Sequence, residues 1–207
     1  MDHTKSAVEI YDKIAKDYAE SFVKKEEEEE IIEEFLQMLP KGARLLDVGC
    51  GTADYFDFIA KHDLHYTGID LSKEMIKVAR EKHKDGEFYV QDMRKMDFPE
   101  SVFDGIFCFN ALIHMPMEEV KIVVADFHAV LKQGGKIIIS VQEGEGEDLV
   151  DEAYLPNQKI FLRRFTEQEL TDILTKHGFK VLKSTRRLLK THRDFGYSRL
   201  YAIAQKL

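Results

Sequence analysis

The sequence predicts an α/β fold in which helices cover both faces of a seven-stranded, mostly parallel sheet with a reversed last strand. Apolar segments of strand length alternate with helical segments as far as Val141, a pattern typical of a doubly wound parallel sheet. One of these strands runs directly into the glycine turn Gly49–Gly51, as in folds that bind nucleotides at strand ends. The closing segments Phe179–Arg187 and Tyr197–Ala204 are close enough in sequence to pair as an antiparallel hairpin.

Two amphipathic helices are expected before the first strand. The first covers Ser6–Ala19 and carries its larger side chains on one face, namely Ile10, Ile14 and Tyr18. The second begins with the acidic run Glu26–Glu30, which we interpret as solvated first turns that the helix dipole stabilises. The segment Pro40–Gly42 ends this second helix.

The first strand and its glycine turn form a cradle of the kind that holds nucleotides. The segment Arg44–Val48 contains no strand breaker and suits a central, buried parallel strand. Gly49 and Gly51 then allow a sharp turn and the close approach of a ligand. Asp47, two residues before the first glycine, would repel a pyrophosphate and attract a cationic amino group. A helix is expected over Asp54–Ala60.

Two further strands end in a carboxylate at the same expected edge of the sheet. The strand Tyr66–Asp70 places Asp70 where a ribose hydroxyl could donate to it. The strand Glu87–Gln91 is followed by Asp92. A nicotinamide dinucleotide is the alternative ligand, but residue 54 is Asp, where that fingerprint has a small residue that seats the helix. Three strand-end acids therefore favour a cationic ligand that carries adenosine.

With these residues in view, the chain resembles the class I S-adenosylmethionine-dependent methyltransferases. Leu45–Thr52 resembles the first motif of that family and Thr67–Ile76 the second. Gln91–Met93, Phe103–Met115 and Leu131–Ser140 follow in the family's order. Ala53 is a departure, because many members carry another glycine there, and we expect a negative φ at this residue.

The resemblance implies one Rossmann-like domain over residues 1–207 with S-adenosyl-L-methionine as cofactor. Residues 1–40 would form a helical lid, and residues 41–142 the cofactor-binding core. Residues 143–207 would provide a substrate loop, the last helix and the β-hairpin. The helix Glu167–His177 is expected to end at Gly178, a left-handed cap.

The resemblance also assigns the cofactor contacts. Residues at the glycine turn would contact the methionine portion: Asp47, Gly49, Cys50 and Gly51. Residues after the second and third strands would contact adenosine: Asp70, Leu71, Met75, Asp92 and Met93. Residues near the methyl group or on the lid would be Tyr11, Tyr18, Asn110 and Ala111. The alternatives are a helix cap for Asp70, although Ser72 suits that role better, and a turn residue for Asp92.

Methyl transfer requires an aligned nucleophile and, for some acceptors, removal of a proton. His114 is the candidate general base, with packing or helix capping as its alternative role, and Tyr18 is the second catalytic candidate. His114 and Glu118 have helical spacing, but no third ligand accompanies them, so we expect no metal site. Further candidates for the substrate pocket are Glu143, Tyr154 and Arg164.

The charge is unevenly distributed, since residues 157–207 carry twelve Lys and Arg against four Asp and Glu. These cations are either a solvated surface or an attraction for an anionic substrate. The residues concerned are Arg163, Arg164, Arg186, Arg187, Lys190 and Arg193. Few aromatic residues are interleaved with them, which makes nucleic acid an improbable partner.

We expect a cytoplasmic protein that acts as a monomer or homodimer. No apolar run reaches the length of a membrane span, and Cys50 and Cys108 are the two cysteines, which favours a reducing compartment. Three functions remain open at this point. The favoured one is methylation of a small-molecule acceptor; the alternatives are methylation of RNA or protein, and a non-catalytic S-adenosylmethionine-binding module.

Overall fold

The computed structural model describes residues 2–21, 26–152, 154–155, 157–188 and 197–207. A seven-stranded sheet forms its centre, with the strand order β3-β2-β1-β4-β5-β9-β8. The strands are β1 (Ala43–Val48), β2 (Leu64–Asp70), β3 (Glu87–Val90), β4 (Phe103–Phe109), β5 (Leu131–Gln142), β8 (Phe179–Arg187) and β9 (Arg199–Lys206). The pairs from β3 to β5 are parallel, whereas β9 is antiparallel to both β5 and β8. The predicted sheet with its reversed last strand is thus confirmed.

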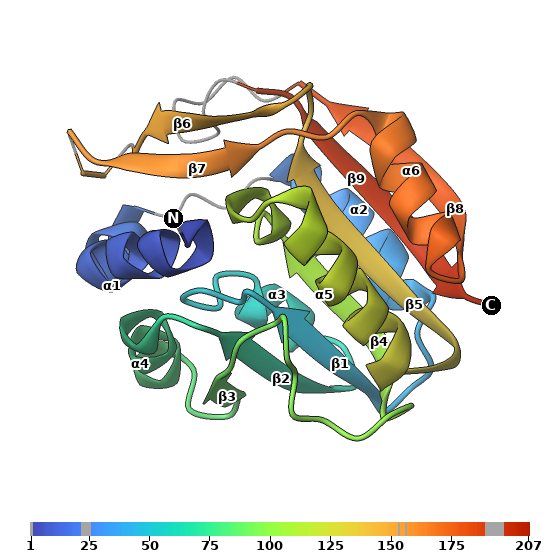
Figure 1. Cartoon of the computed structure of the whole chain (residues 1–207). Helices are drawn as coiled ribbons and strands as arrows, with labels where there is room; N and C mark the ends of the chain where they lie inside the picture. The colour runs from blue at the N-terminus through green and yellow to red at the C-terminus, as the bar shows by residue number, and fades with distance from the viewer. Residues whose placement is uncertain (1, 22–25, 153, 156, 189–196) are drawn as a thin grey trace.

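Helices cover both faces of this sheet (Figure 1). They are α1 (His3–Ser21), α2 (Glu26–Gln37), α3 (Phe56–Ile59), α4 (Lys73–Lys82), α5 (Met117–Val130) and α6 (Glu167–Lys176), with a short 3₁₀ turn η1 (Leu112–His114). Successive side chains of a strand point to opposite faces, and β5 shows the result. Ile137 and Ile139 pack in the cluster that contains α5 and α6, while Ile138 packs with α2 on the other face.

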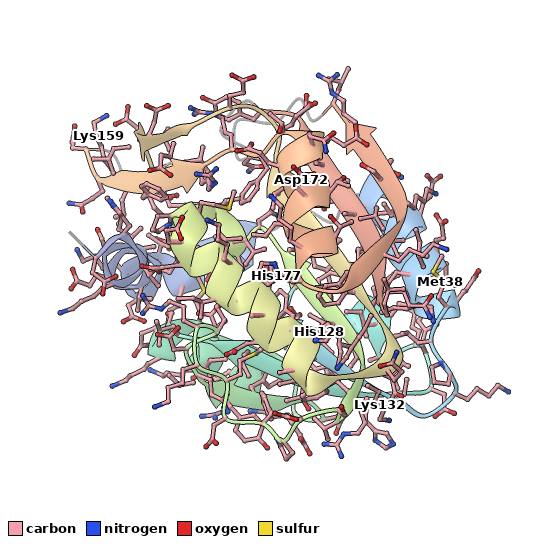
Figure 2. The ribbon with its side chains drawn as sticks, turned by 45° about the vertical axis from the view of Figure 1, so that its right-hand side comes forward. Met38, His128, Lys132, Lys159, Asp172 and His177 are labelled. Atoms are coloured by element: carbon pink, nitrogen blue, oxygen red, sulfur yellow. The ribbon has the colours of Figure 1, made fainter. Side chains whose placement is uncertain are left out.

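The helix α6 begins and ends as its sequence predicts. Thr166 is the N-cap, and its side chain forms a capping box with Glu169. Gly178 follows the helix with φ +82°, the left-handed conformation that glycine adopts readily. Figure 2 shows α5 and α6 side by side on one face of the sheet, with His128 on α5 and His177 at the end of α6.

The helix α1, the predicted lid, lies away from the main sheet, between α4 and a two-stranded ribbon (Figure 1). Ile10 and Ile14 of α1 pack against Met75 and Val78 of α4 and against Ile160. The apolar face predicted for the first helix therefore faces α4 and the ribbon rather than the central strands.

The ribbon itself was not predicted. The substrate loop was expected within residues 143–207, and there β6 (Glu147–Asp151) pairs with β7 (Lys159–Arg163) in a separate antiparallel sheet. The residues of β6 are almost all exposed. A strand of this kind does not show the alternation of apolar and polar residues by which a strand is identified in a sequence. Lys159 lies at the outer end of the ribbon in Figure 2.

The acidic run at the start of α2 is also not uniformly solvated, contrary to prediction. Glu28 is fully buried and forms an ion pair with Arg199 of β9. The hydroxyl groups of Tyr55 and Tyr201 donate to the same carboxylate. The expectation failed because a run of glutamates does not reveal which one faces the sheet.

Candidate active site

Four of the predicted cofactor residues, Gly49, Gly51, Asp70 and Asn110, lie at the carboxyl ends of β1, β2 and β4. Strand β1 pairs with β2 on one side and β4 on the other, so the chain reverses its direction of winding there. Open parallel sheets bind ligands in the crevice outside this switch point. The lid helix α1 and the β6–β7 ribbon lie on the same side of the molecule (Figure 1).

The two glycines of the turn have different structural requirements. Gly49 has φ +70°, and a Cβ on it would lie 2.3 Å from the Cβ of Ala111. Close packing between the ends of β1 and β4 therefore excludes any larger residue. Gly51 has φ +53°, and a Cβ on it would meet nothing within 4 Å. Its backbone faces open space, as the cradle for a ligand requires.

Ala53 adopts a left-handed conformation, with φ +56°. The expected negative φ is therefore wrong. Its side chain is buried among the residues that pack beneath the turn. Residue 53 retains the glycine-like conformation of the turn even though it carries a Cβ.

Asp70 is held rigidly at the end of β2. Its two carboxylate oxygens accept the N–H groups of Gly51 (2.9 Å) and Ser72 (2.8 Å). Burial raises the pKa of Asp70, while these two hydrogen bonds act to lower it. Each oxygen retains a lone pair for a ligand hydroxyl. Ser72 caps α4 by accepting the Met75 N–H, which confirms its predicted role.

Asp47 is buried beneath the turn rather than in the crevice. It is 3% exposed and accepts a hydrogen bond from the Tyr66 hydroxyl at 2.5 Å. Burial raises the pKa of Asp47 to about 7, although the hydrogen bond from Tyr66 opposes this shift. The sequence did not reveal Tyr66 as the partner of Asp47, because the two side chains belong to neighbouring strands and their pairing depends on register.

Asp92 is paired with Arg94 at the end of β3. The Arg94 guanidinium donates to both Asp92 oxygens, at 2.7 Å for the closest pair of atoms. Partial burial acts to raise the pKa of Asp92, but the hydrogen bonds and charge of Arg94 outweigh it and lower the pKa. Arg94 also donates to Glu119 of α5, which in turn accepts from Thr4 of the lid.

The other predicted contacts fall into two groups. The Met93 side chain lies beside Gly49 and Ala111, at the crevice. By contrast, Met75 and the Cys50 thiol are buried in apolar clusters. Leu71 is half-buried and follows Asp70 directly. Asn110 has φ +54°, and its amide oxygen accepts from the Ser140 hydroxyl at 3.3 Å.

His114 joins three parts of the chain. Its Nδ1 lies 2.9 Å from the Phe161 carbonyl of β7, and its Nε2 lies 2.8 Å from the Tyr11 hydroxyl of α1. Because a carbonyl only accepts, Nδ1 carries the proton and Nε2 accepts from Tyr11. Burial lowers the pKa of His114 to about 4, against the smaller raising effect of the Phe161 hydrogen bond. The imidazole is therefore neutral at pH 7.

Tyr18 contributes to a group of aromatic side chains next to this histidine. Its ring lies 6.2 Å from that of Tyr11 and 5.5 Å from that of Tyr154, measured between centroids. The carboxylate of Glu152, which is 5% exposed, lies close enough to raise the pKa of both lid tyrosines, after the larger effect of burial. Glu152 was not predicted, since it stands in an acidic stretch without a motif.

The described arginines among the C-terminal candidates are paired with acids. Arg163 binds Glu147 and Glu169, and Arg164 binds Asp148. The remaining pairs are Arg186 with Glu143 and Arg187 with Glu30. An anionic substrate therefore stays a prediction, and these arginines would have to share their charge with the acids. Lys190 and Arg193 lie outside the described residues. Two of the predicted pocket residues, Glu143 and Arg164, belong to these ion pairs, whereas Tyr154 lies at the lid.

Two further features are absent from the described residues. No group of three or more His, Cys, Asp or Glu side chains there is arranged to hold a metal ion. No described helix is both long and apolar enough to cross a membrane.

Comparison with known proteins agrees with this geometry. The family model described as a methyltransferase domain matches residues 45–135. The O-methyltransferase rstn1 of Aspergillus nomiae is 30% identical over 162 residues, which are 70% of this chain and 68% of that protein. Phosphoethanolamine N-methyltransferase 3 of Arabidopsis thaliana is 35% identical over 119 residues, 54% of this chain but 24% of its own. For two further O-methyltransferases, from Penicillium expansum and Aspergillus sclerotiorum, the chain spans 55% and 57% of the relative.

Solved structures share the fold. An S-adenosylmethionine-dependent methyltransferase from Methanosarcina mazei superposes with a TM-score of 0.77 at 22% identity, covering 86% of this chain and 97% of the other. The match in sequence to a relative over two thirds of its length, together with the sheet order and the glycine turn, leads to one conclusion. The chain belongs to the S-adenosylmethionine-dependent methyltransferases.

Proposed function

We propose that this protein transfers the methyl group of S-adenosylmethionine to a small-molecule acceptor bound beneath α1. Residues 1–40 act as the lid, residues 41–142 hold the cofactor, and residues 143–207 complete the acceptor side. The observation that carries the proposal is the turn at Gly51, whose backbone faces open space while its N–H is fixed by Asp70. A Cβ at residue 51 would fill that space.

The residues present fit this cofactor. Asp70 would accept the ribose hydroxyls with its remaining lone pairs, and the backbone at Gly49 and Gly51 would contact the methionine portion. Met93 would line the adenine side together with Leu71. Asp92 would accept a hydrogen bond from the adenine amino group while its oxygens also accept from Arg94. S-adenosylmethionine supplies a methyl group on a positively charged sulfur, which needs no activation by the protein.

Asp47 would act at a distance from the cofactor amino group. Its carboxylate is buried and accepts a hydrogen bond from Tyr66. It would therefore act on the cofactor by electrostatic attraction across the turn above it, without direct contact. With a pKa of about 7, its ionisation is favoured when a cation binds nearby. Cofactor binding should therefore release a fraction of a proton at neutral pH.

We assign His114 a positioning role rather than that of a general base. A phenolic acceptor has a pKa of about 10, so moving its proton to an imidazole of pKa about 4 is uphill by roughly 8 kcal/mol. That difference makes the histidine a poor proton acceptor in its observed environment. Its hydrogen bonds to Tyr11 and to the Phe161 carbonyl instead hold the lid against β7 and the end of β4. Tyr18 and Tyr154 would then contact the acceptor.

Calorimetric titration with S-adenosylmethionine tests the first step, with NAD as the control ligand. Binding to the unmodified protein, loss of binding in Asp70→Ala and no binding of NAD would support the proposal. Formation of S-adenosylhomocysteine with a panel of amines, phenols and quinols then separates an enzyme from a binding module. A protein that fails to bind S-adenosylmethionine would contradict the proposal. Light scattering of the same samples distinguishes a monomer from a homodimer.

RNA is the second class of acceptor raised by the sequence. Four described arginines of the C-terminal region, Arg163, Arg164, Arg186 and Arg187, are engaged by carboxylates, which reduces the positive charge that they offer to RNA. If RNA were the acceptor, affinity would fall steeply with salt concentration. A filter-binding assay at two salt concentrations measures this directly.

A further inference from the structure

We propose that Tyr11, Tyr18, Tyr154 and Glu152 form a recognition site for the nitrogen of an amine acceptor, which makes the protein an N-methyltransferase. This inference rests on the proposed function and names the acceptor atom that the function leaves open.

The three tyrosine rings form the walls of a corner. Tyr11 and Tyr18 stand two helical turns apart on α1, and their rings are nearly perpendicular, at 86° with centroids 6.2 Å apart. Tyr154 comes from the opposing ribbon and is tilted by 55° to Tyr18 at 5.5 Å. All three side chains are half-buried, so they are neither sealed in an apolar core nor fully solvated. Rings at this angle meet edge to face. A face that such a contact leaves uncovered attracts a cation.

A buried negative charge accompanies these rings. Glu152 is 5% exposed and accepts a hydrogen bond from the Tyr154 N–H at 3.3 Å. Its charge opposes ionisation of both Tyr11 and Tyr18. The tyrosines consequently remain neutral, and the Glu152 carboxylate adds negative potential at the corner. Asp70 adds to this potential on the side of the strand ends, whereas the charge of Asp54 is offset by its ion pair with Lys82.

One cation acts in the opposite direction at Tyr18. The charge of Arg199 lowers the pKa of that phenol. Arg199 is already paired with the fully buried Glu28, however, so the net charge of that pair is zero. The balance of charge around the lid tyrosines is therefore negative, which favours a positively charged or charge-developing ligand.

The chemistry of the site also favours nitrogen over oxygen. A hydroxyl acceptor must transfer its proton to a base, and the histidine beside Tyr11 is a weak one. An amine reacts as its free base, after releasing its ammonium proton to bulk solvent. Its lone pair forms the new N–C bond, the S–C bond breaks, and that electron pair stays on sulfur. The positive charge moves from sulfur to nitrogen, where aromatic faces and a carboxylate stabilise it in the transition state.

A matched pair of probes tests the site without requiring turnover. Choline and 3,3-dimethylbutan-1-ol have nearly the same shape, but choline carries a quaternary nitrogen in place of a carbon. Each is titrated into the protein by calorimetry, with and without saturating S-adenosylhomocysteine. We expect choline to bind at least about tenfold more tightly than the alcohol, from the strength of cation–π contacts.

Variants then locate the selectivity. Tyr18→Leu and Tyr154→Leu should lose the tenfold preference, while Tyr18→Phe, which keeps the ring, should retain it. Glu152→Gln should weaken choline binding several-fold and leave binding of the alcohol unchanged. Glu145→Gln is the matched control, because it removes an exposed acid from the segment that leads into the same ribbon. Circular dichroism confirms that each variant is folded, and the Phe and Gln variants remain informative if the Leu variants are not.

Four results would overturn the inference. Equal binding of choline and the alcohol would show that the corner does not select charge. Unchanged choline binding in both Leu variants and in Glu152→Gln would place cation binding elsewhere. A change in the ratio of affinities for S-adenosylmethionine and S-adenosylhomocysteine, without choline binding, would assign the rings to the cofactor's sulfonium. Methylation of phenols but not amines would also reject the inference while leaving the proposed function intact; absence of cofactor binding would reject the function itself.

Discussion

The buried ion pair between Glu28 and Arg199 makes a large and specific prediction about stability. The Glu28 side chain is fully buried, and that of Arg199 is 8% exposed. Removing one partner of a buried pair destabilises a protein by about 3–5 kcal/mol, because the other charge is left uncompensated. We expect this loss for Glu28→Gln, even though its amide oxygen can still accept from the Tyr201 hydroxyl, now 2.6 Å from the carboxylate.

Urea unfolding measures the effect. A protein of this size unfolds with a slope of about 2–3 kcal/mol per molar urea, so the midpoint should fall by about 1–2 M. Glu30→Gln is the control on the same helix, because Glu30 forms an exposed ion pair with Arg187. Exposed pairs contribute about 0–1 kcal/mol, and that variant should be nearly unchanged.

A double variant separates charge burial from loss of contacts. Arg199→Met keeps most of the side-chain volume, so Glu28→Gln combined with Arg199→Met leaves no buried charge. We expect the double variant to be more stable than the sum of the two single effects implies, by about 2–3 kcal/mol. Additive effects, or a loss for Glu28→Gln no larger than that of Glu30→Gln, would refute the reasoning that the buried pair is coupled.

Four further predictions concern pH, the contact between α1 and His114, and helix capping. The pKa of Asp47 is raised to about 7 in the folded state, so the folded state binds more protons than the unfolded chain between about pH 4 and 7. The stability of the unmodified protein relative to Asp47→Asn should therefore fall as the pH rises through this window. The expected loss, measured by chemical denaturation, is up to about 4 kcal/mol. The pKa of His114 is lowered to about 4, so below about pH 6.5 the unfolded chain binds a proton that the folded state does not. Stability relative to His114→Asn should therefore fall by up to about 3 kcal/mol on acidification to pH 4. A stability difference that does not change with pH would contradict burial as the cause. Tyr11→Phe removes the hydrogen bond to His114 and should lower stability by about 1 kcal/mol while increasing protease sensitivity in α1; equal cleavage rates would argue against a closed lid. Thr166→Ala breaks the capping box of α6 and should lower the free energy of unfolding by about 1 kcal/mol. Thr175→Ala, at the exposed end of the same helix, is the control.

Local patterns in the sequence determined the architecture. Alternating strand and helix segments, the glycine turn, and Ser72 and Gly178 at helix ends all act within a few residues, where turn chemistry and side-chain periodicity dominate. Asp47 near the end of β1, Asp70 at the end of β2 and Asp92 after β3 lie near one edge of the sheet, because parallel strands align their carboxyl ends. The antiparallel pairing of β8 with β9 followed from their closeness in the chain.

Only the tertiary structure decided which polar side chains meet. Glu28 finds Arg199 across 171 residues of chain separation, and Tyr11 finds His114 across 103. One glutamate in an acidic run looks like any other until the sheet is packed beneath it. Likewise, Ala53 took the left-handed conformation because the turn above β1 imposes it. Propensity and periodicity describe a residue's own segment, whereas partners, pKa values and burial depend on the elements that pack against it. The sequence by itself therefore determined the fold and the sheet edge at which we propose the cofactor binds. The tertiary structure decided how α1 and the ribbon lie at that edge, because their contacts join segments far apart in the chain.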